Sequence, residues 1–195
     1  MPKRPVSLKP RQDPLPYALR LDGRNTNDIN LVVIHCTELP DMAMARVYGE
    51  KIHYPEKQTG NSGHFYIDRD GSIEQWVPND RIAHHVRGFN PQSIGIELVN
   101  NGRYPDWFQS GHQIMSEPYH ELQIKALVSL LNHLHSELPG LKQVAGHEDL
   151  DTGMIPSEDK PDIMIRRKLD PGLLFPWSAL MKKISLHRLM APSTG

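Results

Sequence analysis

LVVIHCTE, residues 31–38, is the most informative stretch of the chain for its fold. A short, uninterrupted apolar run rich in Val and Ile is typical of a strand buried on both faces. His35 comes at the carboxyl end of that strand, where ligands and catalytic groups collect in open α/β sheets. A lone histidine in an apolar strand is more often a hydrogen-bonded core residue than a ligand. Its role therefore depends on partners from elsewhere in the chain.

Composition and charge indicate one globular domain. The chain has 195 residues, of which 38% are hydrophobic and 23% charged, enough for one sizeable core. A net charge of -1 provides no basic field that would recruit nucleic acid. No apolar run approaches the length of a membrane span, and the amino terminus lacks the apolar segment of a signal peptide. The single cysteine, Cys36, excludes an intrachain disulfide and is expected to point away from the face that carries His35.

Three further segments read as strands. Residues 64–76 predict a β-hairpin, because Asp70-Gly71 separates two apolar runs and Gly tolerates the positive φ of a tight turn. The segment IGIELV, residues 94–99, predicts a buried strand that carries one acid, Glu97. A short strand at residues 142–145 ends at Gly146-His147.

Helix signals alternate with these strands. Asp41 can cap a helix through about residue 54, and a leucine stripe after Pro118 predicts a long amphipathic helix ending at residues 139–140. Pro176 is expected to open a last helix, whereas residues 100–117 and 148–169 are predicted as loops. The pattern favours a single α/β domain with a central mixed sheet flanked by helices.

Potential metal ligands follow three of the segments. His35, His147 and Asp170 each lie at or just past a predicted strand end. Two imidazoles and a carboxylate suit Zn²⁺, and three protein ligands leave a fourth position for water, which is the catalytic pattern. Their wide spacing in the sequence is weak support by itself.

Five segments together resemble a known family, the zinc-dependent N-acetylmuramoyl-L-alanine amidases of the second amidase type. This family is related to peptidoglycan recognition proteins and to an amidase-type phage lysozyme. The matching segments occur in the family's order over about residues 29–178: VVIHCTE, SGHFYIDRDGSI, AHHVRGFNPQSIGIELVN, VAGHEDL, and KLDPG followed by FPW. The resemblance implies a central mixed sheet with packed helices. We accordingly divide the chain into a Pro-rich arm (1–28), a zinc amidase domain (29–188) and a tail (189–195).

The resemblance also implies roles for single residues. His35, His147 and Asp170 match the ligands of one zinc ion per chain, and Glu97 matches the catalytic acid of the bacterial amidases. Lys168 matches a lysine thought to stabilise the transition state. His64 and His85 match recurring histidines that are not ligands and are expected to have structural or substrate-lining roles.

Two of these assignments have alternatives. Glu97 could instead face solvent or pair with Arg87, whereas as a general base it would take a proton from the attacking water. The stretch 148–169 is longer than in compact bacterial relatives, and its two alternative roles are a lid and a substrate-contacting loop. This insert also supplies rival ligands to Asp170, namely Glu148, Asp149, Asp151 and Asp162.

The resemblance implies hydrolysis of the amide between the lactyl group of N-acetylmuramic acid and L-alanine, in peptidoglycan or muropeptides. A non-catalytic peptidoglycan-binding module of the same fold is the alternative. The lack of a signal peptide predicts a cytoplasmic protein and leaves its cellular role open between muropeptide recycling, a phage lysin and a toxin. Periplasmic action, or delivery to the cell wall by a non-Sec route as for a phage lysin or toxin, is the other possibility. The sequence gives no indication of oligomeric state.

Overall fold

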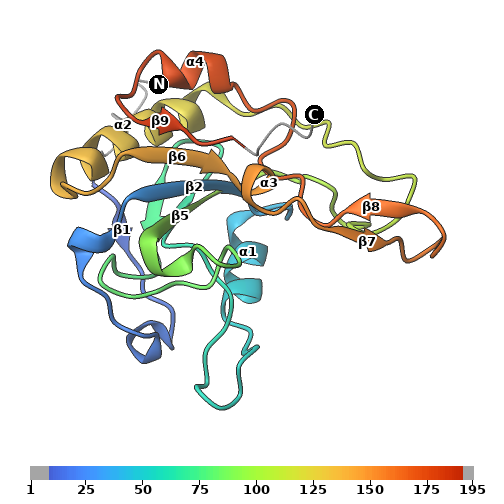
Figure 1. Ribbon diagram of the computed structural model, residues 1–195, viewed down its shortest axis with the longest axis horizontal. Helices are drawn as coiled ribbons and strands as arrows, with labels where there is room; N and C mark the ends of the chain where they lie inside the picture. The colour runs from blue at the N-terminus through green and yellow to red at the C-terminus, as the bar shows by residue number, and fades with distance from the viewer. Residues whose placement is uncertain (1–8, 191–195) are drawn as a thin grey trace, which may run out of the picture.

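A seven-stranded mixed sheet forms the centre of the computed structural model, which describes residues 9–190 (Figure 1). The strand order is β1-β4-β3-β5-β2-β6-β9, and β3 with β4 is the antiparallel pair. The strands are β1 (Arg11–Gln12), β2 (Leu31–Cys36), β3 (Phe65–Ile67), β4 (Ile73–Gln75), β5 (Ser93–Leu98), β6 (Gln143–Gly146) and β9 (His187–Arg188). The predicted α/β class and central mixed sheet are confirmed.

Helices pack against this sheet, and the longest buries the predicted leucine stripe. The α-helices are α1 (Met42–Gly49), α2 (Glu121–Glu137), α3 (His147–Leu150) and α4 (Trp177–Met181). Short 3-10 turns are η1 (Ala18–Arg20), η2 (Thr26–Asp28) and η3 (Asn90–Gln92). Leu127, Leu130 and Leu134 of α2 share one core cluster with Leu180 of α4 and the sheet. None of the helices in the described range combines the length and apolarity that a membrane span requires.

The central strand β2 presents its side chains to two different layers. Val32 and Ile34 belong to the core beneath α2, whereas Leu31 and Val33 belong to a smaller cluster on the opposite face. Because side chains alternate along a strand, His35 lies on the face of Leu31 and Val33. The pattern that made the strand recognisable thus also directs this histidine away from the main core.

Several boundaries differ from the sequence predictions. Helix α1 has the predicted cap, since the Asp41 side chain accepts from Met44 N, but it ends at Gly49 and not near residue 54. Helix α2 starts at Glu121, three residues after Pro118. The predicted loop 148–169 contains most of α3 and a separate hairpin of β7 (Met154–Pro156) and β8 (Met164–Arg166). Figure 1 shows this hairpin beyond the carboxyl ends of β2 and β6.

Residues 9–28 of the Pro-rich arm lie on the domain. Strand β1 pairs with β4, and Leu15 and Tyr17 are buried. The Tyr17 hydroxyl donates to Gly49 O at 2.6 Å, which links the arm to the end of α1. Residues 1–8 of the predicted arm and 191–195 of the predicted tail lie outside the described residues. The domain boundaries remain a prediction.

Candidate metal centre and active site

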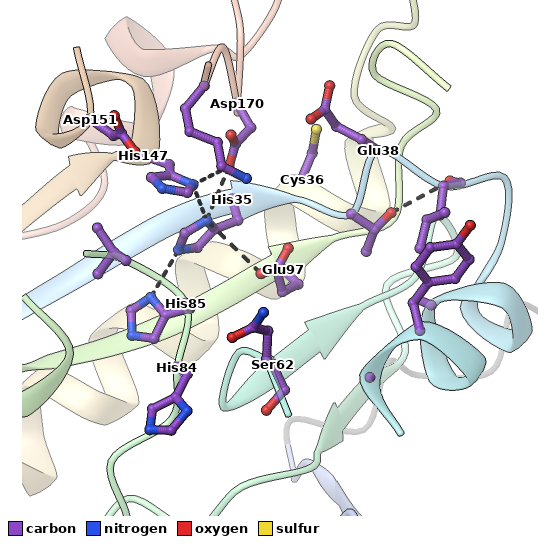
Figure 2. A pocket seen from close by; sticks show the side chains of 18 of the residues that line it. His35, Cys36, Glu38, Ser62, His84, His85, Glu97, His147, Asp151 and Asp170 are labelled. Atoms are coloured by element: carbon purple, nitrogen blue, oxygen red, sulfur yellow. Dashed lines mark hydrogen bonds and ion pairs between the residues drawn. The ribbon is translucent and has the colours of Figure 1, made fainter. Parts of the chain in front are cut away.

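Three side chains from distant parts of the sequence converge at the carboxyl end of β2. His35 Nδ1 lies 3.0 Å from His147 Nδ1 and 3.0 Å from Asp170 Oδ2, and His147 Nδ1 lies 3.1 Å from the same oxygen. All three residues are buried, and Figure 2 shows their side chains directed toward one another. Ligands about 2.0–2.1 Å from a tetrahedral zinc ion lie about 3.3 Å apart, close to these separations.

The fold brings each ligand candidate to the same edge. Strands β2 and β6 are parallel neighbours, so the end of β2 with His35 and the start of α3 with His147 lie side by side. Asp170 is placed by its backbone, because Glu148 N donates to Asp170 O at 2.9 Å. The Tyr119 hydroxyl donates to the next carbonyl, Pro171 O, at 2.7 Å.

The chemistry of this donor set fits a cation. Burial, together with the neighbouring His147, lowers the pKa of His35 to about 4, so its imidazole is neutral near pH 7. If His35 donates its Nε2 proton to His85 Nδ1, 3.0 Å away, its Nδ1 lone pair faces the two other donor atoms. Although burial favours its neutral form, His147 and His35 hold the pKa of Asp170 well below its usual range. Asp170 Oδ1 is buried without a hydrogen-bond partner in the described structure.

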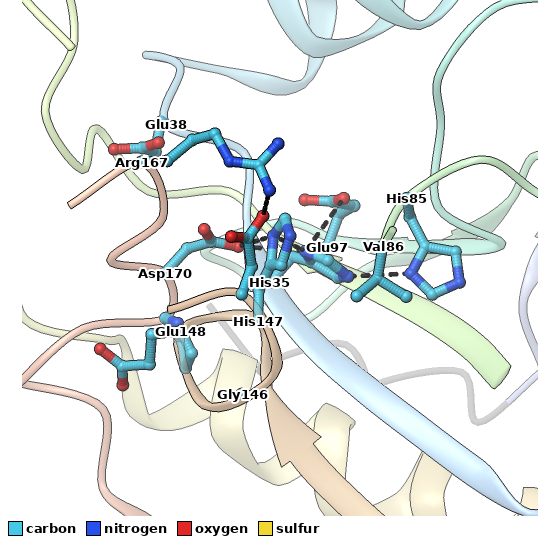
Figure 3. A network of polar contacts seen from close by, with 12 residues as sticks. His35, Glu38, His85, Val86, Glu97, Gly146, His147, Glu148, Arg167 and Asp170 are labelled. Atoms are coloured by element: carbon cyan, nitrogen blue, oxygen red, sulfur yellow. Dashed lines mark hydrogen bonds and ion pairs between the residues drawn. The ribbon is translucent and has the colours of Figure 1, made fainter. Parts of the chain in front are cut away.

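The rival acids of the insert have other partners or other positions. Asp149 Oδ2 accepts from Gly146 N at 3.0 Å, which caps α3, and Asp151 forms an ion pair with Arg167. Asp162 is exposed. The Glu148 side chain points away from the cluster in Figure 3. Among the described residues, the group of potential metal ligands found is His35, His147 and Asp170.

Glu97 lies beside this cluster on the neighbouring strand. The parallel register of β2 and β5 pairs His35 with Glu97, and Glu97 Oε1 lies 4.0 Å from His35 Nδ1. Burial and the nearby Asp170 carboxylate raise the pKa of Glu97 well above its ordinary value, and Lys168 offsets part of this shift. No ion pair joins Glu97 to Arg87 in the described part of the chain. A carboxylate of raised pKa beside a metal site is suited to moving a proton.

A cavity of about 780 Å³ opens over the cluster. Glu97, Lys168, Arg87 and the three ligand candidates all line it. For the Lys168 ammonium, no hydrogen bond or ion pair is found within residues 9–190. Trp107 and Phe108, from the loop after β5, form another part of the wall.

His85 and His64 occupy different places. His85 lines the cavity, lies next to His35 Nε2, and has its own Nε2 3.2 Å from Ser93 Oγ. The Ser93 hydroxyl donates in turn to Phe89 O at 2.8 Å. His64 is fully buried, accepts from Gly95 N at 3.0 Å through Nδ1, and is not among the cavity-lining residues.

Two glycines leave the space that these side chains need. A Cβ atom on Gly95 would come within 2.7 Å of the His85 ring, and one on Gly63 within 2.8 Å of Glu97 Cγ. Real Cβ atoms essentially never make contacts this close, so larger residues would displace His85 or Glu97. Both glycines stand inside the segments that carried the family resemblance, but the sequence alone did not indicate this reason for them.

One buried ion pair at the site was not foreseen. Glu38, three residues after His35, accepts two hydrogen bonds from the Arg103 guanidinium, at 2.7 Å from Nε and 2.9 Å from Nη2. Arg103 is 1% exposed and Glu38 7% exposed. No local spacing predicts this pair, because three strands, β3, β4 and β5, separate the two residues along the sequence.

Comparisons with known proteins found a matching amidase family and similar solved structures. The family described as N-acetylmuramoyl-L-alanine amidase matches residues 25–173. The 1,6-anhydro-N-acetylmuramyl-L-alanine amidase AmpD of Haemophilus influenzae is 29% identical, covering 82% of this chain and 85% of its own. A solved complex of AmiD from E. coli with anhydro-N-acetylmuramic acid-L-Ala-D-gamma-Glu-L-Lys has a TM-score of 0.60 at 26% identity, covering 80% of this chain and 57% of its own. The endolysin amidase LysCS from Clostridium intestinale, at 21% identity, shares the fold with a TM-score of 0.65 over 93% of this chain and 98% of its own.

Proposed function

The chain belongs to the N-acetylmuramoyl-L-alanine amidase family, and from this membership we propose that His35, His147 and Asp170 hold the zinc ion on which its activity depends. The chain is an enzyme that hydrolyses the amide bond between N-acetylmuramic acid and L-alanine. The alternative of a non-catalytic binding module is therefore set aside. The observation that carries the zinc proposal is the convergence of three buried donor atoms within 4.8 Å of one another on the wall of the cavity.

In this proposal each side chain around the metal site has a separate role in the reaction. Zinc, when bound, lowers the pKa of water and polarises a carbonyl group. Glu97 takes the proton of the attacking water at a carboxylate oxygen and returns it to the leaving nitrogen of L-alanine. Lys168, whose ammonium has no ion-pair partner among residues 9–190, stabilises the negative charge that develops on the carbonyl oxygen. The position of both groups on the cavity wall supports these roles.

We assign His85 to the orientation of His35. Its Nδ1 can accept the His35 Nε2 proton, and the Ser93 hydroxyl and Phe89 carbonyl continue the chain of contacts. A hydrogen bond to the far nitrogen of a ligating histidine fixes its tautomer and ring direction. This role is compatible with contact between His85 and substrate, because His85 also lines the cavity. For His64, complete burial favours a structural role.

The substrate that we propose is a 1,6-anhydro-muropeptide released from the wall. It is supported by the name of the Haemophilus influenzae relative and by the anhydro-muropeptide bound in the AmiD complex. Together with this substrate we propose a cytoplasmic role in muropeptide recycling, in preference to periplasmic action or delivery to the cell wall. Fractionation of the native host, followed by activity assays, distinguishes these locations.

Cleavage of purified substrates tests the proposal. The zinc-loaded protein is incubated with anhydro-muropeptides and, separately, with intact sacculi, and mass spectrometry identifies the new L-alanine amino terminus. We expect kcat/KM to be about tenfold or more higher on the anhydro-muropeptide, since specificity is a difference in transition-state binding. Equal or faster release from sacculi would contradict the substrate assignment. Unchanged activity after complete removal of zinc by a chelator would contradict the metal mechanism.

Shortening the insert tests its contribution to substrate choice. The β7–β8 hairpin contacts the loop that carries Trp107 and Phe108: Glu158 N donates to Phe108 O at 2.9 Å, and Asp159 accepts from the Ser110 N–H and hydroxyl, both at 2.7 Å. Removing residues 154–164 should therefore loosen the cavity wall. We expect full zinc content, because Asp170 and Pro171 have separate backbone partners, and a several-fold change in the ratio of rates on the two substrates.

The point variant Asp159→Ala is the control for this deletion, since it removes the Ser110 contacts and leaves the rest of the hairpin in the chain. It should shift the ratio in the same direction by a smaller factor. Loss of zinc from the shortened protein, with zinc retained by Asp170→Ala, would show that the insert supplies the third ligand.

A further inference from the structure

We propose that Arg103 is a positioning residue of the amidase site, which holds the backbone before Lys168 in place and so places the Lys168 ammonium. This inference rests on the role proposed above for Lys168. Arg103 lies in the loop after β5 and is 1% exposed. A guanidinium has five N–H donors, and in Arg103 each has an acceptor. The acceptors are Glu38 Oε1, Glu38 Oε2, Gln113 Oε1, Arg166 O and Arg167 O, at 2.7 to 3.2 Å.

Through these acceptors Arg103 connects the end of β2 with the segment before Lys168, which the sheet itself does not connect. Glu38 follows His35 by three residues at the end of β2, whereas Arg166 and Arg167 immediately precede Lys168. Strand β8 pairs with β7 in a separate two-stranded sheet, so no strand ladder fixes residues 166–168 against β2. The Arg103 guanidinium donates to Arg166 O and Arg167 O, both at 3.2 Å, and thereby ties this segment to Glu38.

Lys168 has less support of its own than Asp170. Arg167 N also donates to Gly153 O at 2.9 Å, but that contact ties the segment to the turn before β7 and not to β2. The backbone at Asp170 and Pro171 has its own partners, Glu148 N and the Tyr119 hydroxyl. The Lys168 side chain, by contrast, has no hydrogen bond or ion pair within the described residues, so its place over the cavity follows from its backbone. Loosening Arg103 should therefore affect the oxyanion-facing charge while the metal ligands keep their arrangement.

The backbone of Glu38 is strained, as expected where surrounding contacts fix the position of a residue. Glu38 has φ of 49°, in the left-handed region that non-glycine residues rarely adopt, and Trp107 Nε1 donates to its carbonyl at 3.0 Å. A buried ion pair often adds little to stability compared with apolar residues of similar size. Stability alone is thus a weak reason for a fully partnered, charged group at this place.

A conservative substitution of Arg103 separates the effect of its positive charge from the effect of its hydrogen-bond geometry. Arg103→Lys keeps the positive charge near Glu38 but lacks the planar set of five donors, so it cannot hold the carbonyls of residues 166 and 167 as well. Arg69 provides a matched control. It also donates twice to one carboxylate, Glu117, at 2.6 and 3.0 Å, and Glu117 lies at the far end of the same loop. No contact joins Arg69 to residues 166–168 within the described structure.

The experiment measures zinc content, melting temperature, kcat and KM for Arg103→Lys, Arg69→Lys, Lys168→Met and the double variant Arg103→Lys/Lys168→Met. We expect Arg103→Lys to retain one zinc ion and lose about tenfold in kcat, with KM within about threefold, because misplacement by about 1 Å can cost up to 10²-fold. Arg69→Lys should stay within about twofold of the parent kcat. In the Lys168→Met background, Arg103→Lys should add little further loss, since the charge that it places is already absent.

Parental kcat in Arg103→Lys, or a full additional loss in the double variant, would overturn the proposal. Full turnover by Lys168→Met would instead show that the proposed role of Lys168 is wrong. If Arg103→Lys does not fold, Glu38→Gln carries the same test. The glutamine can still accept from Arg103 but holds it less firmly, so kcat should fall with zinc retained, and an unchanged kcat would count against the proposal.

Discussion

Replacement of His35, His147 or Asp170 by alanine is expected to remove most of the bound zinc and to lower turnover by about 10³-fold or more. Each substitution leaves two donors around a space in which three converge at 3.0 to 3.1 Å. Without the ion, neither the lowered pKa of the attacking water nor the polarised carbonyl is available. Elemental analysis of the purified variants, together with single-turnover assays, measures both effects.

Two further variants serve as controls, one with no expected effect on zinc binding and one with an intermediate effect. His133 is exposed on α2, so His133→Ala should keep full zinc and activity and excludes a general effect of losing a histidine. His85→Ala leaves all three donors in place and should weaken zinc affinity by only about 10- to 100-fold, as is usual when the partner of a ligating histidine is lost. If the His35 and His147 variants each keep a full equivalent of zinc, the ligand assignment is wrong.

Glu97→Gln should keep its zinc, remain folded and lose turnover by about 10²-fold or more, the usual scale for a general acid–base group. Glutamine has nearly the same shape but cannot take the proton of the attacking water. Because burial raises the pKa of Glu97, its ionised form opposes folding near neutral pH. The melting temperature should therefore stay the same or rise slightly when the charge is removed.

Binding measurements separate catalysis from substrate affinity in this variant. A muropeptide should bind Glu97→Gln about as tightly as the parent, since the lost interaction acts in the transition state. A structural Glu97 predicts the opposite combination, a lower melting temperature with near-normal turnover of the folded fraction. The absence of an Arg87 partner within the described residues already argues against the ion pair that the sequence left open. Near-normal turnover would remove Glu97 from the mechanism.

The sequence was most informative where local pattern and burial agree. The apolar run that begins at residue 31 and the predicted strand 94–99 became the adjacent parallel strands β2 and β5, and their register alone brings His35 beside Glu97. Helix α1 was predicted too long because Ile52 continues the apolar spacing of Ala45 and Tyr48, whereas Gly49 is its last residue. Its first turn was predicted correctly because the Asp41 cap is a purely local interaction.

Other features depend on contacts that a single sequence does not reveal. The β7–β8 hairpin has only Ile155 and Ile165 turned inward, so its strands show almost no alternation of apolar and polar residues. The pairing of Glu38 with Arg103 depends on where a loop returns, over a separation that no local periodicity records. The ligand set was suggested by position along the chain but depended on the family resemblance for support, since His35, His147 and Asp170 share no local spacing.

The outermost strands of the main sheet have a consequence for how short the domain can be made. Strand β1 covers the free side of β4, and β9 covers the free side of β6, with only two residues each. Both lie outside residues 25–173, the range that the family match covers. A chain trimmed to that range would leave the N–H and C=O groups of two inner strands open to pairing with another molecule. Such a fragment would keep the ligand candidates and yet be prone to self-association, so protection from aggregation depends on segments that take no part in the chemistry.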